Sequence, residues 1–246
     1  MLLLACGLCS CNRYYYKPNG VNAPLFTGAK QVHLAACATP DGAFTDVQAA
    51  YSPINHLGII GNFSTFSYQA SDADVSSGNV DAKAHLAELG AGYYYANGKK
   101  VKLIYDVYAG AGGGTMKSDV NMSFIRAFVQ PGAGIRTPWF EMSLNYRCSA
   151  IRYYDLNTNG HDITYLQQHN LVYGNRRIDN TDYLFAEPAI TFRGGYKFIK
   201  VQTQYVIANP ISNVPWQYYN TLINFGLSFE LEELLNAINP KKERKN

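Results

Sequence analysis

Apolar and polar side chains alternate with a period of two along most of this chain, from about residue 31 to residue 231. A β-strand sends successive side chains to opposite faces, so the pattern predicts strands with one apolar and one polar face. The last segment shows it best, with odd positions apolar and even positions mostly polar: Ile223, Phe225, Leu227, Phe229 and Leu231 against Asn224, Gly226, Ser228 and Glu230.

The pattern predicts about ten strands, separated by links that are alternately short and long. The expected strands are 30–38, 44–52, 57–68, 85–95, 100–110, 122–132, 138–153, 183–193, 196–208 and 219–231. Short links are expected at 53–55, 97–98, 134–137 and 194–195, and longer ones at 69–83, 111–121, 154–182 and 209–218. Short turns at one end and long loops at the other are the layout of outer-membrane barrels.

One face of the expected sheet carries almost no charge, whereas the other is charged on nearly every strand. A soluble barrel has its charges outside, so this pattern favours a barrel with an apolar outer surface and a polar lumen. The residues expected to form a charge network in the lumen are Asp46, Glu88, Asp106, Arg126, Glu141, Arg147, Glu187, Arg193, Lys200 and Glu230. A hairpin centred near Met116 would place Asp106 beside Arg126, and the next turn would bring Glu141 to the same arginine.

Aromatic residues gather near the expected strand ends, where barrels in membranes carry two girdles. One group lies at the short-turn end: Tyr51, Tyr93, Tyr94, Tyr95, Trp139, Phe140, Tyr196 and Phe198. The other lies at the long-loop end: Phe66, Tyr68, Tyr153, Tyr154, Tyr183, Trp216, Tyr218 and Tyr219. An even number of strands would leave both chain termini on the short-turn side.

The start of the chain is a short apolar stretch that ends in small residues, as in an export signal. Its end, Leu8-Cys9-Ser10-Cys11, resembles the lipobox of bacterial lipoproteins, and this resemblance implies that Cys11 receives lipid, such as palmitate. A plain secretory signal with incidental cysteines is the alternative. We expect a signal peptide over 1–10, a tether over 11–27, the barrel over 28–231, and an amphipathic helix with a basic tail over 232–246.

With these features the chain resembles small outer-membrane β-barrel proteins of Gram-negative bacteria, in a lipid-anchored variant. The resemblance implies an all-β fold: a single up-and-down antiparallel transmembrane β-barrel of about ten strands (8–12), followed by a short C-terminal helix. It implies an outer-membrane location with periplasmic termini, outer-membrane lipid as partner and other envelope proteins as further candidates.

Composition agrees with this class, because charged residues make up 16% of the chain, below the roughly 25% of soluble domains. A net charge of +3 is too small and too dispersed to indicate nucleic-acid binding. No apolar run is long enough for a membrane-spanning helix.

Candidate chemistry is weak. The longest loop holds His161, Asp162 and His169, but their spacing matches no metal motif, and a solvated loop is the simpler interpretation. The glycines at 110 and 112–114 lack the Lys-Ser/Thr of a phosphate loop, and we expect them to bend a strand or start a loop. We therefore expect no cofactor, no metal and no catalytic residue.

The sequence thus predicts a non-enzymatic outer-membrane barrel lipoprotein, a scaffold or partner-binding element with a charge-plugged lumen. Three alternatives remain open: a narrow passive channel for small solutes, a soluble lipocalin-like carrier, and a lipid-modifying barrel enzyme.

Overall fold

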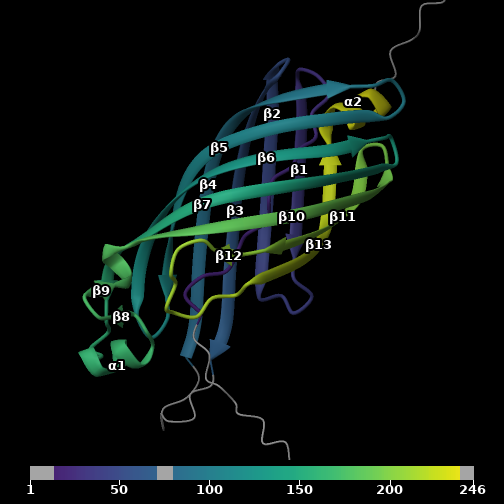
Figure 1. Ribbon diagram of the computed structural model, residues 1–246. Helices are drawn as coiled ribbons and strands as arrows, with labels where there is room; N and C mark the ends of the chain where they lie inside the picture. Colours follow the sequence, from purple (N-terminus) through teal and green to yellow (C-terminus); the bar gives the residue numbers. More distant parts are fainter. Residues whose placement is uncertain (1–13, 71–79, 239–246) are drawn as a thin grey trace, which may run out of the picture.

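The computed structural model of the chain describes residues 14–70 and 80–238 and shows a closed antiparallel β-barrel of ten strands (Figure 1). The strands run in up-and-down order: β1 (Gln31–Ala38), β2 (Phe44–Ile54), β3 (Leu57–Ala70), β4 (Val80–Asn97), β5 (Lys102–Lys117), β6 (Asn121–Arg136), β7 (Phe140–Asn157), β10 (Asp182–Tyr196), β11 (Ile199–Ile207) and β13 (Thr221–Glu230). The barrel closes because β13 pairs with both β1 and β11. The predicted fold class is confirmed.

Smaller elements lie at the two ends of the barrel. The link between β7 and β10 contains α1 (Ile163–Gln168), β8 (Val172–Tyr173), β9 (Arg176–Arg177) and the 3-10 helix η1 (Ile178–Asn180). The two-residue strand β12 (Asn209–Pro210) pairs with β10. After β13 the chain continues directly into α2 (Leu231–Ile238), the predicted C-terminal helix.

The links define two ends, which we call the short-turn end and the long-loop end. The turns after β2, β4, β6 and β10 lie at the short-turn end together with α2, and the remaining links lie at the long-loop end, where Figure 1 shows α1, β8 and β9. The expected long link 111–121 is wrong: β5 and β6 run on to a turn of three residues, 118–120.

The glycines at 112 and 114 lie inside β5, where a Cβ atom would meet the backbone carbonyls of Ala87 and His85 on β4. The absence of a side chain at these two positions allows β5 to lie close to β4.

The alternation of the sequence becomes the inside and outside of the barrel. Apolar positions of every strand are exposed, such as Leu89, Val201 and Phe225, at 66%, 61% and 50%. The ten residues expected in the lumen network are all buried. The barrel is therefore apolar outside and charged inside.

The chain that precedes β1 runs inside this barrel. Residues 18–26 are all buried, and the described chain starts with Tyr14 at the long-loop end and reaches β1 at the short-turn end. The expected tether over 11–27 is therefore wrong for its described part. The expectation that both termini lie on the short-turn side does not hold for the described chain, because Tyr14 and α2 lie at opposite ends.

The aromatic residues expected as a girdle at the long-loop end mostly point inward. Tyr153, Tyr183 and Trp216 are buried in one cluster with Tyr15 and Tyr16 of the N-terminal segment. The backbone of Tyr15 is fixed further by two hydrogen bonds: its N–H donates to the Gln217 carbonyl, and its carbonyl accepts from the Tyr153 hydroxyl. These aromatic side chains close the barrel around the entering chain.

Candidate functional site

The lumen and the N-terminal segment that fills it, residues 15–26, form the candidate site. The segment has no regular secondary structure, so its peptide groups need partners from the barrel wall when they are buried. Those partners are long polar side chains at alternate strand positions, which point into the barrel. They form two charged clusters with a zone rich in amide side chains between them.

The first group, the Glu187 cluster, lies towards the long-loop end. The Glu187 carboxylate forms ion pairs with Arg126 at 2.5 Å and with Arg147 at 2.7 Å, and the Tyr16 hydroxyl donates a hydrogen bond to it. Arg126 also lies 3.4 Å from Glu88. Two cations therefore balance two carboxylates in an enclosed space, where an unpaired charge would cost several kcal/mol.

The asparagine of the segment completes this cluster. The Asn19 amide donates to Glu88 at 2.6 Å, and its side-chain oxygen accepts from Arg126 at 2.6 Å. Arg147 donates to the Asn19 backbone carbonyl at 3.0 Å. The segment thus bonds directly to the charged groups of the wall.

Amide side chains hold the middle of the segment. Gln204 accepts from the Val21 backbone N–H and donates to the Val21 carbonyl, both at 2.8 Å, so its amide pairs with this residue as a neighbouring strand would. Asn22 donates to the Ala49 carbonyl, and Gln130 donates to the Asn22 carbonyl. These bonds fix the segment against opposite sides of the wall.

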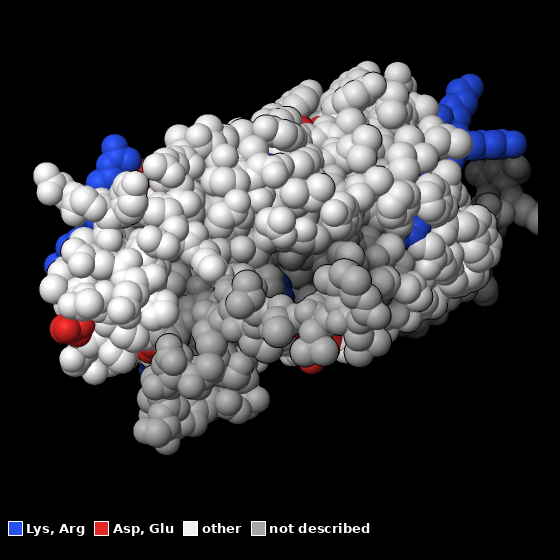
Figure 2. Space-filling view, turned by 60° about the horizontal axis from the view of Figure 1, so that its bottom comes forward, with Lys and Arg blue, Asp and Glu red and all other residues white. Residues whose placement is uncertain are grey.

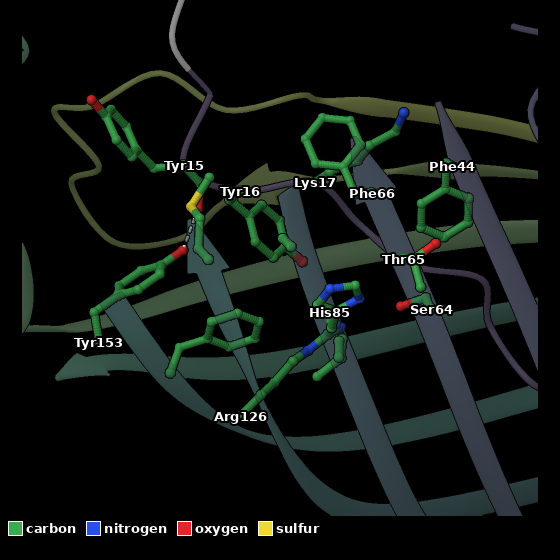
Figure 3. A pocket seen from close by; sticks show the side chains of 14 residues that line it. Tyr15, Tyr16, Lys17, Phe44, Ser64, Thr65, Phe66, His85, Arg126 and Tyr153 are labelled. Carbon is green, nitrogen blue, oxygen red and sulfur yellow. Dashed lines mark hydrogen bonds between the residues drawn. The ribbon is translucent and has the colours of Figure 1, made fainter. Parts of the chain in front are cut away.

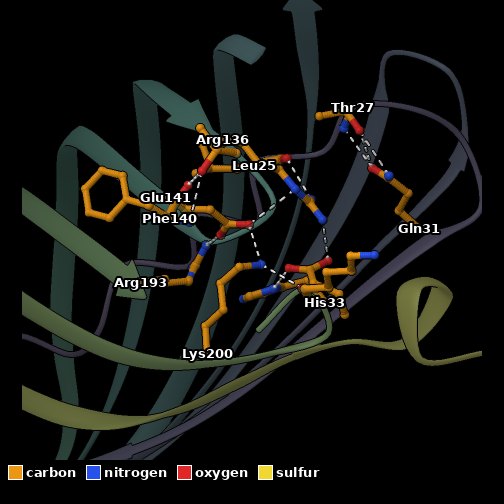
Figure 4. A network of polar contacts seen from close by, with 12 residues as sticks. Leu25, Thr27, Gln31, His33, Arg136, Phe140, Glu141, Arg193 and Lys200 are labelled. Carbon is orange, nitrogen blue, oxygen red and sulfur yellow. Dashed lines mark hydrogen bonds and ion pairs between the residues drawn. The ribbon is translucent and has the colours of Figure 1, made fainter. Parts of the chain in front are cut away.

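The second group, the Glu141 cluster, lies at the short-turn end (Figure 4). Glu141 contacts Arg193 and Lys200 at 3.0 Å and Arg136 at 3.2 Å. Glu230 contacts Arg136 at 3.2 Å and His33 at 2.8 Å. The two arginines also bind the segment: Arg193 donates to the Ala23 carbonyl at 2.8 Å and Arg136 to the Leu25 carbonyl at 3.2 Å.

The predicted pairing of Asp106 and Glu141 with Arg126 is wrong. The β5–β6 hairpin turns at residue 119 rather than near Met116, so Asp106 pairs with Gly132 and Arg126 with Gly112. Because the hairpin turns three residues further along the chain, each residue of β5 pairs with a residue of β6 six positions later than predicted. Asp106 is buried, and within the described residues its Oδ1 atom has no hydrogen-bond partner. Asp46 is also buried and accepts from Gln48 at 2.6 Å.

Sequence reasoning missed Arg136 and the asparagines of the segment. Arg136 was assigned to a turn, whereas β6 extends to include it and points it inward. Arg136 is an even-numbered residue like Arg126 and Gln130, which point inward on the same strand, so the alternation of the sequence would have identified it had the strand been extended. Asn19 and Asn22 belong to a segment without periodicity, which gave no such signal.

A small cavity remains between Tyr16, Lys17 and the wall, next to His85 and Arg126 (Figure 3). Its volume is about 40 Å³, enough for a few water molecules. Lys17 lies over the Phe66 ring, 4.6 Å from its centroid, and burial lowers the pKa of its ammonium group. The cavity is far smaller than pockets that enclose drug-sized ligands.

The histidines of the longest loop are separated by an aromatic ring. Tyr165 lies against His161 and His169, with centroids 3.8 Å and 4.5 Å away, and Asp162 caps the start of α1. Across residues 14–70 and 80–238, no three potential metal ligands come together.

No protein-family model matches the chain, and no curated protein matches it either. No helix in the described ranges is long and apolar enough to cross a membrane. Conclusions on function therefore rest on the geometry of the barrel and its lumen.

Proposed function

We propose that the chain is a non-enzymatic outer-membrane β-barrel lipoprotein, a scaffold or partner-binding element whose lumen is closed by its own N-terminal segment. The observation that carries this proposal is the uncharged belt around the barrel. Every charged side chain in the middle of the described strands points inward, while the outward positions there are uncharged and mostly apolar.

The height of the belt suits a membrane. The outward positions of β7 from Phe140 to Ala150 carry no charge. Ten residue steps of about 3.4 Å, at a tilt of about 35–45°, give a height of about 24–28 Å. Outer-membrane barrels have an apolar band of about 25 Å.

Charged side chains are found at the edges of this belt. Lys99 and Lys100 lie in a turn at the short-turn end, and the exposed pair Arg152–Asp182 lies towards the long-loop end. In Figure 2 the visible face is white over most of its length, with blue side chains standing at its two ends. A soluble barrel would instead expose charges along its whole wall.

Aromatic side chains mark one edge of the belt. Tyr51, Tyr93, Tyr95, Trp139 and Tyr196 are exposed near the short-turn end, at 43–56%. Their rings combine an apolar body with a polar tip, which suits the interface between lipid and water.

The filled lumen favours a scaffold over a channel. The segment from Pro18 to Phe26 is buried along its whole length and is bonded to both charged clusters. Passage of solutes would require this segment to leave, which would break the bonds to Asn19, Val21 and Ala23. The passive channel is therefore the second candidate, and it needs a displaced segment.

The signal peptide over 1–10 and the lipid acceptor Cys11 lie outside the described residues. Cys11 precedes Tyr14 by three residues in the sequence, and Tyr14 lies at the long-loop end. In the proposed lipoprotein the acyl chains therefore enter the leaflet at the long-loop end, across the membrane from α2. The termini are then on opposite sides, not both periplasmic.

Membrane fractionation tests the proposal. We expect the full chain to stay in the membrane pellet after alkaline carbonate and high salt, and to leave it only with detergent, because its apolar belt contacts lipid acyl chains. Release by carbonate would contradict the proposal and favour the soluble carrier.

A further inference from the structure

A cavity of about 240 Å³ opens at the short-turn end, and its lining is strongly basic. The lining includes six cations and one carboxylate: Lys99, Lys100, Lys102, Arg136, Lys197, Lys200 and Glu233. These cations come from three parts of the barrel rim, the β4–β5 hairpin, the end of β6 and the β10–β11 hairpin. Closure of the barrel brings them together.

The floor of the cavity is built from buried side chains. Lys200 is 2% exposed and is held by Glu141 at 3.0 Å. Arg136 is fixed by Glu141, by Glu230 and by the Leu25 carbonyl. The cluster beneath has three cations, Arg136, Arg193 and Lys200, against two carboxylates, Glu141 and Glu230, so it keeps one positive charge.

Four lysines of the rim, Lys99, Lys100, Lys102 and Lys197, add to this charge. Among the residues that the structure describes, none of them forms an ion pair, and Glu233 is the one acid in the lining. Like charges gathered around a concave wall raise the local concentration of ions of opposite sign. The geometry therefore supplies the charge, donors and space for a multivalent anion.

We propose that this cavity, the basic mouth, binds a phosphate-bearing anion that carries at least two negative charges. Lysine ammonium groups bind phosphate oxygens as point charges. The four rim lysines carry their charges on long flexible stems, so they can adjust to a tetrahedral phosphate above the ion-paired Arg136 and Lys200. The source of the phosphate is either a soluble diphosphate or the headgroups of anionic lipid. Binding of a soluble diphosphate concerns the mouth alone and does not depend on the proposed membrane location, whereas binding of lipid headgroups rests on it.

The test compares two variants of the full chain, each lacking two lysines. Lys100→Gln with Lys197→Gln removes two rim charges of the basic mouth. Lys83→Gln with Lys117→Gln removes two exposed lysines that are neighbours at the long-loop end, so it serves as the control. Circular dichroism and heat-dependent gel mobility establish that both variants keep the folded barrel.

Calorimetry with sodium pyrophosphate, in detergent and at constant ionic strength, measures binding of the soluble anion. We expect affinity about tenfold weaker in the mouth variant, and unchanged in the control, because two attractive charges are lost close to the anion. A parallel arm measures the thermal stability of each protein in phosphatidylcholine nanodiscs with and without cardiolipin, a lipid whose headgroup carries two phosphates.

A response to pyrophosphate that is lost in the mouth variant identifies a soluble phosphate ligand. A stabilisation by cardiolipin that is lost in the mouth variant, without pyrophosphate binding, identifies a lipid headgroup. If neither probe separates the mouth variant from the control, the inference is wrong. Carbonate extraction is unaffected by that result, so the two proposals fail separately.

Discussion

Arg126 is enclosed on all sides and shares its charge between Glu187 and Glu88. Its counterpart on the surface is Arg152, which forms a similar pair with Asp182 but is 56% exposed. Burial separates the two cases. Removing one partner from a buried pair leaves an uncompensated charge, whereas water solvates the partner that remains at the surface.

We therefore expect Arg126→Ala to lower the free energy of unfolding by about 3–5 kcal/mol. Arg152→Ala is the matched control and should change stability little, since both partners are solvated. Denaturant titration of the refolded barrels, or the temperature at which they lose their folded gel mobility, measures the difference. Equal stability of the two variants would show that the Glu187 cluster does not support the fold.

The residue scale also shows what alternation can and cannot predict. It identified which charged side chains point inward, because that depends only on whether a position is odd or even within a strand. It failed to identify their partners, because contacts across a hairpin depend on where the chain turns. Asp106 and Arg126 were expected to meet, yet the turn lies three residues further along and separates them.

At the scale of elements, the N-terminal segment is the part that the sequence did not predict. Its Pro, Gly and Asn residues are typical of an exposed tether, and it has no periodicity. Burial of such a segment requires a wall of matching donors and acceptors, which exists only after ten strands have closed. The barrel could be predicted from local patterns, whereas its occupant could not.

Gly20 is the tightest point of this segment. A Cβ atom there would collide with Asp46 and Gln48, which are hydrogen-bonded to each other, and would also approach Gln204. Gly28 lies two residues beyond the end of this segment and has open space, with Asn55 Oδ1 the nearest atom at 4.0 Å. The same substitution at the two positions therefore distinguishes an effect of packing in the lumen from an effect of lost backbone flexibility.

We expect Gly20→Leu to displace the segment and open the lumen, so that conductance across planar lipid bilayers rises. Gly28→Leu should keep the low conductance of the wild type. Protease susceptibility of the segment in membrane vesicles gives a second readout. If Gly20→Leu leaves both conductance and protease protection unchanged, the segment does not close the barrel.

At the scale of the whole molecule, the passage of the N-terminal segment through the lumen puts the two ends of the described chain at opposite ends of the barrel. The described chain starts at the long-loop end and finishes, in α2, at the short-turn end. In the proposed lipoprotein, Cys11 and the C-terminal tail therefore lie on opposite sides of the membrane. The expected basic tail itself lies outside the described residues.

Metabolic labelling with a radioactive fatty acid should mark the wild type and not Cys11→Ala. In intact cells, an epitope inserted between residues 11 and 14 should react with impermeant antibody, and one after residue 246 should not. Label that persists in Cys11→Ala would contradict this acceptor site. Epitopes that react on the same side would contradict the threaded arrangement.

The most direct measurement is a depth scan along the outward positions of β11: Ile199, Val201, Thr203, Tyr205 and Ile207. Each is replaced by arginine, and unfolding is measured after refolding in lipid vesicles. A barrel that spans the membrane predicts a penalty of about 2–4 kcal/mol near the middle of the strand, at Thr203, which fades towards both ends. A profile that is flat along the strand would contradict the membrane-spanning barrel.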